Sequence, residues 1–221
     1  MNALIIGASR GLGLEFVRQY RAAGAKVTAT ARDEAALATL RDLGATAVAL
    51  DVANAESASR LAWQIDAAAF DVVVLCAGVY GPKTDGLTPP TESDFDTVMR
   101  TNVLGPMRVI PQLADALAPG AKLAVLSSRM GSIGSRASSG GWLYRASKAA
   151  VNSVLVDASL ALSGKAICVA FHPGWVRTDM GGAGADLAPE DSVKDLRQVI
   201  AGLTRADSGR FLNHDGSAIV W

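Results

Sequence analysis

This sequence lacks the net charge and the long apolar runs that many binding and membrane proteins carry. Its 221 residues include 21 basic and 21 acidic side chains, for a formal net charge of +0, and they contain no basic run. We therefore expect no nucleic-acid or membrane-surface partner. No apolar run reaches the ~18 residues that a membrane span requires. Met1-Asn2 leads into only Ala3 to Ile6 as apolar residues, without a basic segment, so we expect a cytoplasmic protein without a secretory signal.

Aromatic residues and cysteines are also scarce. Aromatics make up 5% of a chain that is 50% hydrophobic, so Ala, Val, Leu and Ile must build the core. This composition suits helices packed on a parallel sheet. The two cysteines, Cys76 and Cys168, lie in apolar runs without metal-ligand spacing. We interpret both as reduced core residues and expect no metal site.

Short apolar runs alternate with helical patterns along the chain, without a break in composition. The runs predict buried strands and the segments between them predict helices. The chain is therefore expected to form one α/β domain over residues 1–221, a doubly wound parallel sheet with helices on both faces. Strands are predicted at 3–6, 26–31, 45–50, 72–76, 122–126 and 166–171, and helices at about 34–43, 56–69, 92–117 and from Tyr144 to about Leu162.

Two segments of this pattern carry helix-breaking residues. The helical region at 92–117 contains Gly105-Pro106 and Pro111, which we expect to bend or divide it because proline removes a backbone donor. The segment 83–90 contains two prolines and a glycine and is predicted to be irregular.

A glycine-rich turn follows the first predicted strand. Gly7, Gly11 and Gly13 come directly after this strand and open a helix. The spacing differs from the commoner Gly-x-Gly-x-x-Gly, but a strand before and a helix after are typical of a turn that cradles a pyrophosphate. We therefore predict that a dinucleotide binds here.

Tyr144 and Lys148 form a second motif. They lie one helical turn apart and so share a helix face. An ammonium close to a phenol lowers the phenol pKa from its ordinary value of about 10, which permits proton transfer nearer neutral pH. Such pairs also occur by chance on helix surfaces. The acid–base interpretation is favoured because other motifs lie at carboxyl ends of strands, where parallel sheets bind ligands; these are Gly7, Arg32, Asp51, Ala77-Gly78, Ser128 and Pro173-Gly174.

With these motifs in place, the chain resembles the short-chain dehydrogenase/reductase family over almost its whole length. The resemblance is carried by Gly7-x-x-x-Gly11-x-Gly13, Asn102, Ser128 and Tyr144-x-x-x-Lys148. Within the family the chain is similar to the small C-factor-like carbonyl reductases, judged by residues 127–133 and 209–216. The resemblance implies a single Rossmann-type domain with strand order 3-2-1-4-5-6-7.

The resemblance also implies a catalytic set for converting carbonyl to alcohol. Tyr144 would be the general acid, and Lys148 would lower its pKa and bind the nicotinamide ribose. Ser128 would polarise the substrate carbonyl, and Asn102 would hold a water that links Lys148 to solvent. The implied cofactor-binding residues are Gly7, Ser9, Arg10, Gly11, Leu12, Gly13, Arg32, Asp51, Val52, Ala77, Gly78, Asn102, Tyr144, Lys148, Pro173, Gly174, Val176 and Thr178.

The chain departs from the family pattern at several positions. Ile6 stands where the family usually has Thr, and Leu75-Cys76 replaces two asparagines whose amides brace neighbouring strands. The interval between Ser128 and Tyr144 is longer than usual, with the extra residues expected in the Ser/Gly-rich loop at 136–141. Ser127 therefore remains a rival of Ser128 as the active serine.

The substrate is expected to be a small or moderately apolar carbonyl compound. Its pocket would be formed by the loops 80–90, 135–142 and 180–189, which are rich in Gly, Ser and Ala. Ser128 and Tyr144 would contact the substrate, and Trp142 is assigned equally to packing or to a substrate contact.

Two arginines favour NADP over NAD. Arg32 ends the second predicted strand, where an arginine accommodates the 2′-phosphate, and Arg10 lies in the glycine turn. Guanidinium groups match a phosphate dianion well. Asp33 is interpreted as a helix cap. The competing hypothesis is that Asp33 binds the ribose and the protein prefers NAD.

The leading functional hypothesis is an NADP-dependent carbonyl reductase or alcohol dehydrogenase acting on a small molecule. The alternative is a dinucleotide-binding regulatory or signalling protein of the C-factor type on the same fold. An epimerase is disfavoured because too few residues follow Asp179 for a larger substrate domain. The long helices that contain Asn102 and Tyr144 resemble those that the family uses to form homodimers or homotetramers.

Overall fold

The structure, a computed structural model, describes residues 1–66, 68–84 and 86–221. Seven strands form one sheet in the order β3-β2-β1-β4-β5-β6-β7, and all neighbours are parallel. The predicted strand order and Rossmann-type fold are therefore confirmed. The strands are β1 (Asn2–Ile6), β2 (Lys26–Ala31), β3 (Thr46–Ala49), β4 (Phe70–Leu75), β5 (Leu117–Leu126), β6 (Ala166–His172) and β7 (Phe211–Asn213).

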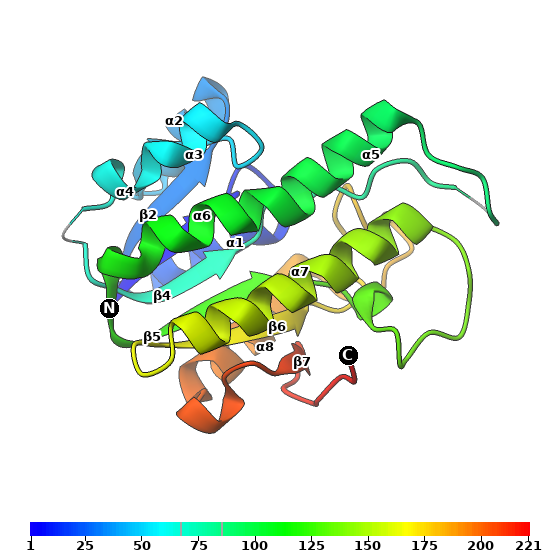
Figure 1. Cartoon of the computed structure of the whole chain (residues 1–221). Coiled ribbons are helices and arrows are strands. Elements are labelled where there is room, and N and C mark those ends of the chain that lie inside the picture. Colours follow the sequence, from blue (N-terminus) through cyan, green and yellow to red (C-terminus); the bar gives the residue numbers. More distant parts are fainter. Residues whose placement is uncertain (67, 85) are drawn as a thin grey trace.

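Helices cover both faces of the sheet, with α6 and α7 in front and α1 and α8 behind in Figure 1. One apolar core joins the sheet to α4, α6 and α7 through Leu61, Leu113 and Leu155. A second core joins it to α1, α2 and α8 through Phe16 and Leu196. The helices are α1 (Gly11–Ala22), α2 (Glu34–Asp42), α3 (Ala55–Ser59), α4 (Leu61–Gln64), α5 (Glu92–Met99), α6 (Gly105–Leu113), α7 (Trp142–Ala161) and α8 (Pro189–Gly202).

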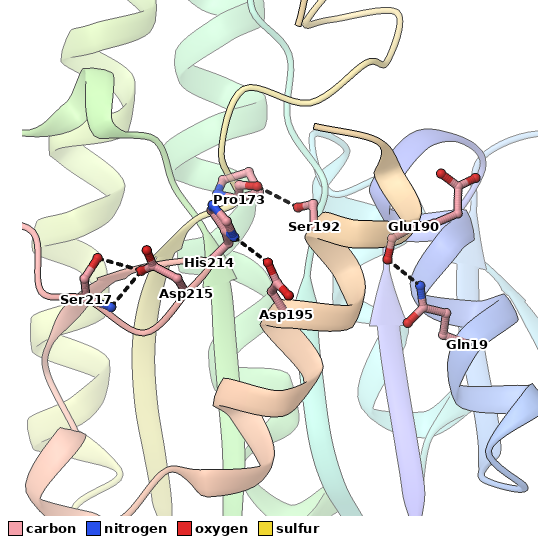
Figure 2. Close-up of polar contacts among 8 residues, drawn as sticks. All are labelled: Gln19, Pro173, Glu190, Ser192, Asp195, His214, Asp215 and Ser217. Atoms are coloured by element: carbon pink, nitrogen blue, oxygen red, sulfur yellow. Dashed lines mark hydrogen bonds and ion pairs between the residues drawn. The ribbon is translucent and has the colours of Figure 1, made fainter. Parts of the chain in front are cut away.

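Helices α1 and α8 contact each other although they come from opposite ends of the chain. The Gln19 amide donates a hydrogen bond to the Glu190 carbonyl over 2.9 Å, as Figure 2 shows. The Arg197 guanidinium lies 4.7 Å from the centroid of the Tyr20 ring, within the range of a cation–π contact. Helix α8 therefore packs against α1 at Gln19 and Tyr20.

The helical region predicted at 92–117 is confirmed from Glu92 to Ala116, and it is divided. A π-helical turn at Arg100–Leu104 separates α5 from α6. Gly105-Pro106 begins α6, as the prediction of a division requires, whereas Pro111 lies inside α6. A 3₁₀ turn at Ala114–Ala116 continues the helical region after α6, as predicted. The strand predicted at 122–126 is wrong at its start, because β5 already begins at Leu117, which pairs with Phe70 before a register shift.

The helix predicted at 56–69 is also shorter than expected. It forms as α3 and α4 and ends at Gln64, whereas Ala69 has a φ of 45° that no helix continues through. Residue 67 of this prediction lies outside the described residues. In the segment 83–90 the described residues form turns and coil, as predicted, and residue 85 lies outside the described residues. Within the described ranges, no helix is long and apolar enough to span a bilayer.

Candidate active site

A cleft of about 1200 Å³, including its open mouth, lies at the carboxyl ends of the strands. The strand-end prediction therefore located the cleft correctly. Of the predicted cofactor-binding residues, those that line it are Gly7, Ser9, Arg10, Gly11, Leu12, Gly13, Arg32, Asp51, Val52, Ala77, Gly78, Tyr144, Lys148, Pro173 and Thr178.

The glycine turn leaves backbone exposed where a side chain would block it. A Cβ on Gly7 would lie 2.7 Å from the backbone of Ala77, and one on Gly13 would lie 2.1 Å from the Gly7 carbonyl oxygen. Helix α1 starts at Gly11, and the first N–H groups of a helix lack partners within it. These features fit a pyrophosphate held at the start of α1.

Backbone contacts brace this turn where the expected side chains are missing. The Gly7 N–H donates to the Thr30 hydroxyl over 3.0 Å. The N–H groups of Cys76 and Ala77 both donate to the Ile6 carbonyl, over 2.8 and 3.1 Å. Strands β1 and β4 are therefore tied together at the cleft without the two asparagine amides that the family usually supplies.

We expect Gly13→Ala to destabilise the protein, because its Cβ would overlap backbone atoms that have little room to move. Overpacking at such a position costs about 3 kcal/mol at the upper end of its usual range, which corresponds to a fall in Tm of about 6–12 °C. Thermal unfolding measures this fall in Tm. Gly202→Ala is the matched control, since no atom of the described residues lies within 4 Å of its Cβ position in α8, and its Tm should be unchanged or higher. Equal Tm values for the two variants would contradict the contact.

The two arginines predicted to bind a 2′-phosphate differ in their surroundings. Arg32 follows β2, is exposed and lines the cleft. The Asp33 carboxylate accepts a hydrogen bond from the Ala36 N–H over 2.9 Å, so it caps α2 as predicted. Arg10 also lines the cleft, but its guanidinium is 2.7 Å from the Asp179 carboxylate, with both side chains about three-quarters exposed at 73% and 74%. An exposed pair of this kind is weak, and it partly neutralises Arg10.

The predicted catalytic residues Tyr144 and Lys148 lie on α7 and are both buried. The Lys148 Nζ atom is 5.7 Å from the centroid of the Tyr144 ring. Its ammonium donates a hydrogen bond to the Leu126 carbonyl over 2.9 Å. The helix spacing therefore brings the two side chains to the floor of the cleft, as the sequence predicted.

The pKa of Tyr144 changes in the opposite direction from the prediction. Burial raises the pKa of Tyr144 to about 12, opposed by a hydrogen bond with Ser128 and reinforced by the charge of Tyr80. Burial also lowers the pKa of Lys148 to about 8. The prediction that Lys148 lowers the Tyr144 pKa is therefore wrong for this structure, because burial has the largest effect on this pKa and the influence that lowers it comes from Ser128.

The two serines that end β5 have different partners. The Ser127 hydroxyl donates to the Asn152 carboxamide oxygen over 2.5 Å, inside the protein. The Ser128 hydroxyl accepts from the Met130 N–H over 3.1 Å and is hydrogen-bonded to Tyr144. Of the two rivals, Ser127 is among the residues that line the cleft, whereas Ser128 is the one that interacts with Tyr144.

Asn102 lies in the π-helical turn and is 1% exposed. Its amide bonds both backbone groups of Val79, accepting from the N–H and donating to the carbonyl over 2.8 Å each. It also donates to the Ser147 hydroxyl over 3.0 Å. The Asn102 side chain is therefore fully engaged, and Pro106, four residues further on, has no N–H to donate to the Asn102 carbonyl.

Residues 1–186 match the family model described as short chain dehydrogenase. The chain belongs to the short chain dehydrogenase family. The enzyme class expected from the sequence, an NAD(P)-dependent short-chain dehydrogenase/reductase, is thereby confirmed. Among curated relatives, C-signal of Myxococcus xanthus is 38% identical over 154 residues, which cover 68% of this chain and 92% of that protein.

Solved structures of family members superpose over the whole of this short-chain dehydrogenase. A putative short-chain dehydrogenase/reductase from Burkholderia multivorans, with bound NADP, has a TM-score of 0.90 at 30% identity and covers 100% of this chain and 99% of its own. The carbonyl reductase Sniffer of D. melanogaster has a TM-score of 0.89 at 28% identity, with coverage of 100% and 99%.

The start of the loop between β6 and α8 in this short-chain dehydrogenase is fastened to α8, and so is the turn after β7. The Ser192 hydroxyl donates to the Pro173 carbonyl over 2.6 Å, and the His214 ring is 2.9 Å from the Asp195 carboxylate, as Figure 2 shows. A Cβ on Gly174 would lie 2.4 Å from Leu187. The predicted residues Gly174 and Val176 thus shape this loop and are not among the residues that line the cleft.

Tyr80 and Met180 both contact Tyr144. The sequence indicated only that they belong to loops expected to form the substrate pocket. The Met180 sulfur lies 3.9 Å from the Tyr144 hydroxyl oxygen, and the Tyr80 ring stacks on Tyr144. The one sequence signal for Met180 is that it follows the predicted cofactor-binding residue Thr178 by two positions. Trp142, predicted as a substrate contact or packing, begins α7 and is 36% exposed, outside the residues that line the cleft.

Proposed function

We propose that this chain is an NADP-dependent carbonyl reductase, interconverting an aldehyde or ketone with its alcohol. The observation that supports this most strongly is that Tyr144 and the glycine turn line the same cleft. NADP is preferred because Arg32 lies at the end of β2 while Asp33 is engaged in capping α2. The relatives agree with this choice, since one is solved with NADP and another is a carbonyl reductase.

In the proposed reaction Tyr144 gives a proton to the substrate oxygen. The nicotinamide of the bound cofactor would supply the hydride. As negative charge develops on the carbonyl oxygen, the Tyr144 hydroxyl protonates it, and Ser128 donates a second hydrogen bond to the same oxygen. A phenol whose pKa is raised to about 12 remains protonated at neutral pH, which suits the reductive direction.

Lys148 and Asn102 would support this transfer. The Lys148 ammonium, held by the Leu126 carbonyl over 2.9 Å, would also bind the ribose of the cofactor. The Asn102 side chain is occupied by Val79 and Ser147. Its backbone carbonyl would therefore hold the water that connects Lys148 with solvent. The pyrophosphate would be held by the N–H groups of the glycine turn and α1.

The test is the consumption of NADPH and NADH by the unmutated protein with a panel of aliphatic and aromatic aldehydes and ketones. We expect turnover with some of these compounds and a higher kcat/KM for NADPH than for NADH. A protein that binds NADPH tightly but reduces none of them would contradict the proposal.

That outcome would instead favour a regulatory or signalling protein that binds the dinucleotide. The similarity to C-signal gives this second function its support. Against it stands the complete set of Asn102, Ser128, Tyr144 and Lys148, which binding alone would not require.

A further inference from the structure

Tyr80 covers one face of the tyrosine proposed as the acid. The two ring centroids are 4.5 Å apart and the ring planes are inclined by 25°. Aromatic rings at this separation attract each other beyond the effect of the buried area alone. Tyr144 is 7% exposed, whereas Tyr80 is only partly buried and belongs to the loop that follows β4. Tyr80 therefore stands between Tyr144 and the solvent on that side.

The backbone next to Tyr80 is tied to the helix that carries Tyr144. Asn102 holds both backbone groups of Val79 and donates to the Ser147 hydroxyl. The Ser147 hydroxyl in turn donates to the Tyr144 carbonyl over 2.8 Å. One buried amide thus links the residue before Tyr80 to the helical turn of Tyr144.

The other side of the Tyr80 ring is fitted to the start of α7. The Gly141 N–H donates to the Thr84 carbonyl over 3.1 Å, which fastens the loop to the helix. Gly141 has a φ of +60°, and a Cβ there would lie 2.7 Å from the Tyr80 hydroxyl oxygen. The space for Tyr80 therefore depends on glycine at position 141.

We propose that Tyr80 is a positioning residue for proton transfer, which holds the Tyr144 ring in its place beside Ser128 and shields it from water. The proposal rests on the proposed function of Tyr144. Tyr80 also affects the acidity of Tyr144. Burial is the main cause that raises the pKa of Tyr144, and the charge of Tyr80 adds to it.

Two substitutions separate the ring from the hydroxyl group of Tyr80. Tyr80→Leu removes the stacked ring and should lower kcat about three- to tenfold, the size expected for one aromatic pair, with the KM for NADPH unchanged. Tyr80→Phe keeps the ring, so its kcat should stay within about twofold of that of the unmutated protein. Such a difference is smaller than the loss of an aromatic pair would cause. A fall in kcat of equal size in both variants, or in neither, would overturn the proposal.

The pH profile gives a readout that loop stability does not move. A general acid works while protonated, so activity is present below the Tyr144 pKa and is lost as the pH rises through it. Tyr80→Leu admits water to Tyr144 and lowers its pKa, which should move the alkaline limb to lower pH. An alkaline limb that stays in place would show that Tyr80 does not shield Tyr144.

A spectroscopic measurement distinguishes failure of this proposal from failure of the proposed function. The chain contains 3 tyrosines, so tyrosine-labelled protein gives few ring signals in NMR, which Tyr20→Phe and Tyr80→Phe assign. Loss of the stacked ring in Tyr80→Leu should move the Tyr144 ring protons downfield, while Tyr80→Phe leaves them nearly in place. This holds even for a protein that reduces no carbonyl compound. Tyr144 protons that do not respond to Tyr80→Leu would overturn the proposal.

Discussion

Tyr144→Phe is expected to lower kcat by about 10²–10⁴-fold, the usual contribution of a positioned general acid. The phenyl ring keeps the stacking with Tyr80 and the packing of α7, so only the proton donor is lost. Binding of NADPH should change little. The measurements are kcat from NADPH consumption and the Kd of NADPH from a fluorescence titration.

The matched control is Tyr20→Phe, which removes the hydroxyl of another buried tyrosine. Tyr20 lies on α1 against Arg197, in the core on the opposite side of the sheet from α7. Loss of the Tyr20 hydroxyl should leave kcat near that of the unmutated protein. A Tyr144→Phe protein with a kcat within a few-fold of the control would remove Tyr144 from the role of proton donor.

Arg32→Ala is expected to weaken NADPH binding and to leave NADH binding almost unchanged. A hydrogen bond to a charged group contributes about 1.5–3 kcal/mol, or about ten- to a hundredfold in affinity. NADH has no 2′-phosphate, so it does not make this hydrogen bond and its affinity should not depend on Arg32. Arg10→Ala should have a smaller effect, because Arg10 is already paired with Asp179. Ala31→Asp should go further than Arg32→Ala, because a carboxylate repels the phosphate and accepts a hydrogen bond from a free 2′-hydroxyl.

The Kd values of both cofactors, measured for each variant, test this prediction. Arg41→Ala is the control, since Arg41 is a half-exposed arginine on α2 paired with Glu34 and is not among the residues that line the cleft. If the unmutated protein preferred NADH, Asp33 and not Arg32 would be the residue that selects the cofactor.

The sheet could be predicted from the sequence because its strands are buried on both faces. Such strands appear as apolar runs, and glycine or a polar residue ends each run. The start of β5 could not be predicted in this way. Ala118-Pro119-Gly120 has the composition of a turn, yet the pairing of Leu117 with Phe70 places this segment in the sheet. That pairing joins residues far apart in the chain.

The cleft residues could be predicted for the same reason, since the carboxyl ends of parallel strands meet at one edge. Features that depend on packing between loops could not. Nothing in the local sequence indicates that Tyr80 stacks on Tyr144, or that Arg10 pairs with Asp179. The direction of the Tyr144 pKa was wrong because residue spacing gives the nearest charge but not the loss of water around the phenol.

The contact between α1 and α8 has a consequence for how the chain assembles during synthesis. Helix α1 leaves the ribosome early, but Glu190 and Arg197, which cover Gln19 and Tyr20, come near the end of the chain. At ~5–20 residues per second, the side of α1 that packs against α8 waits roughly 10–40 s for its partner. During that interval its apolar and aromatic groups are open to a chaperone or to another nascent chain. A pause in translation before α8 would therefore lengthen the period in which this helix, which we propose holds the cofactor, is exposed to misassembly.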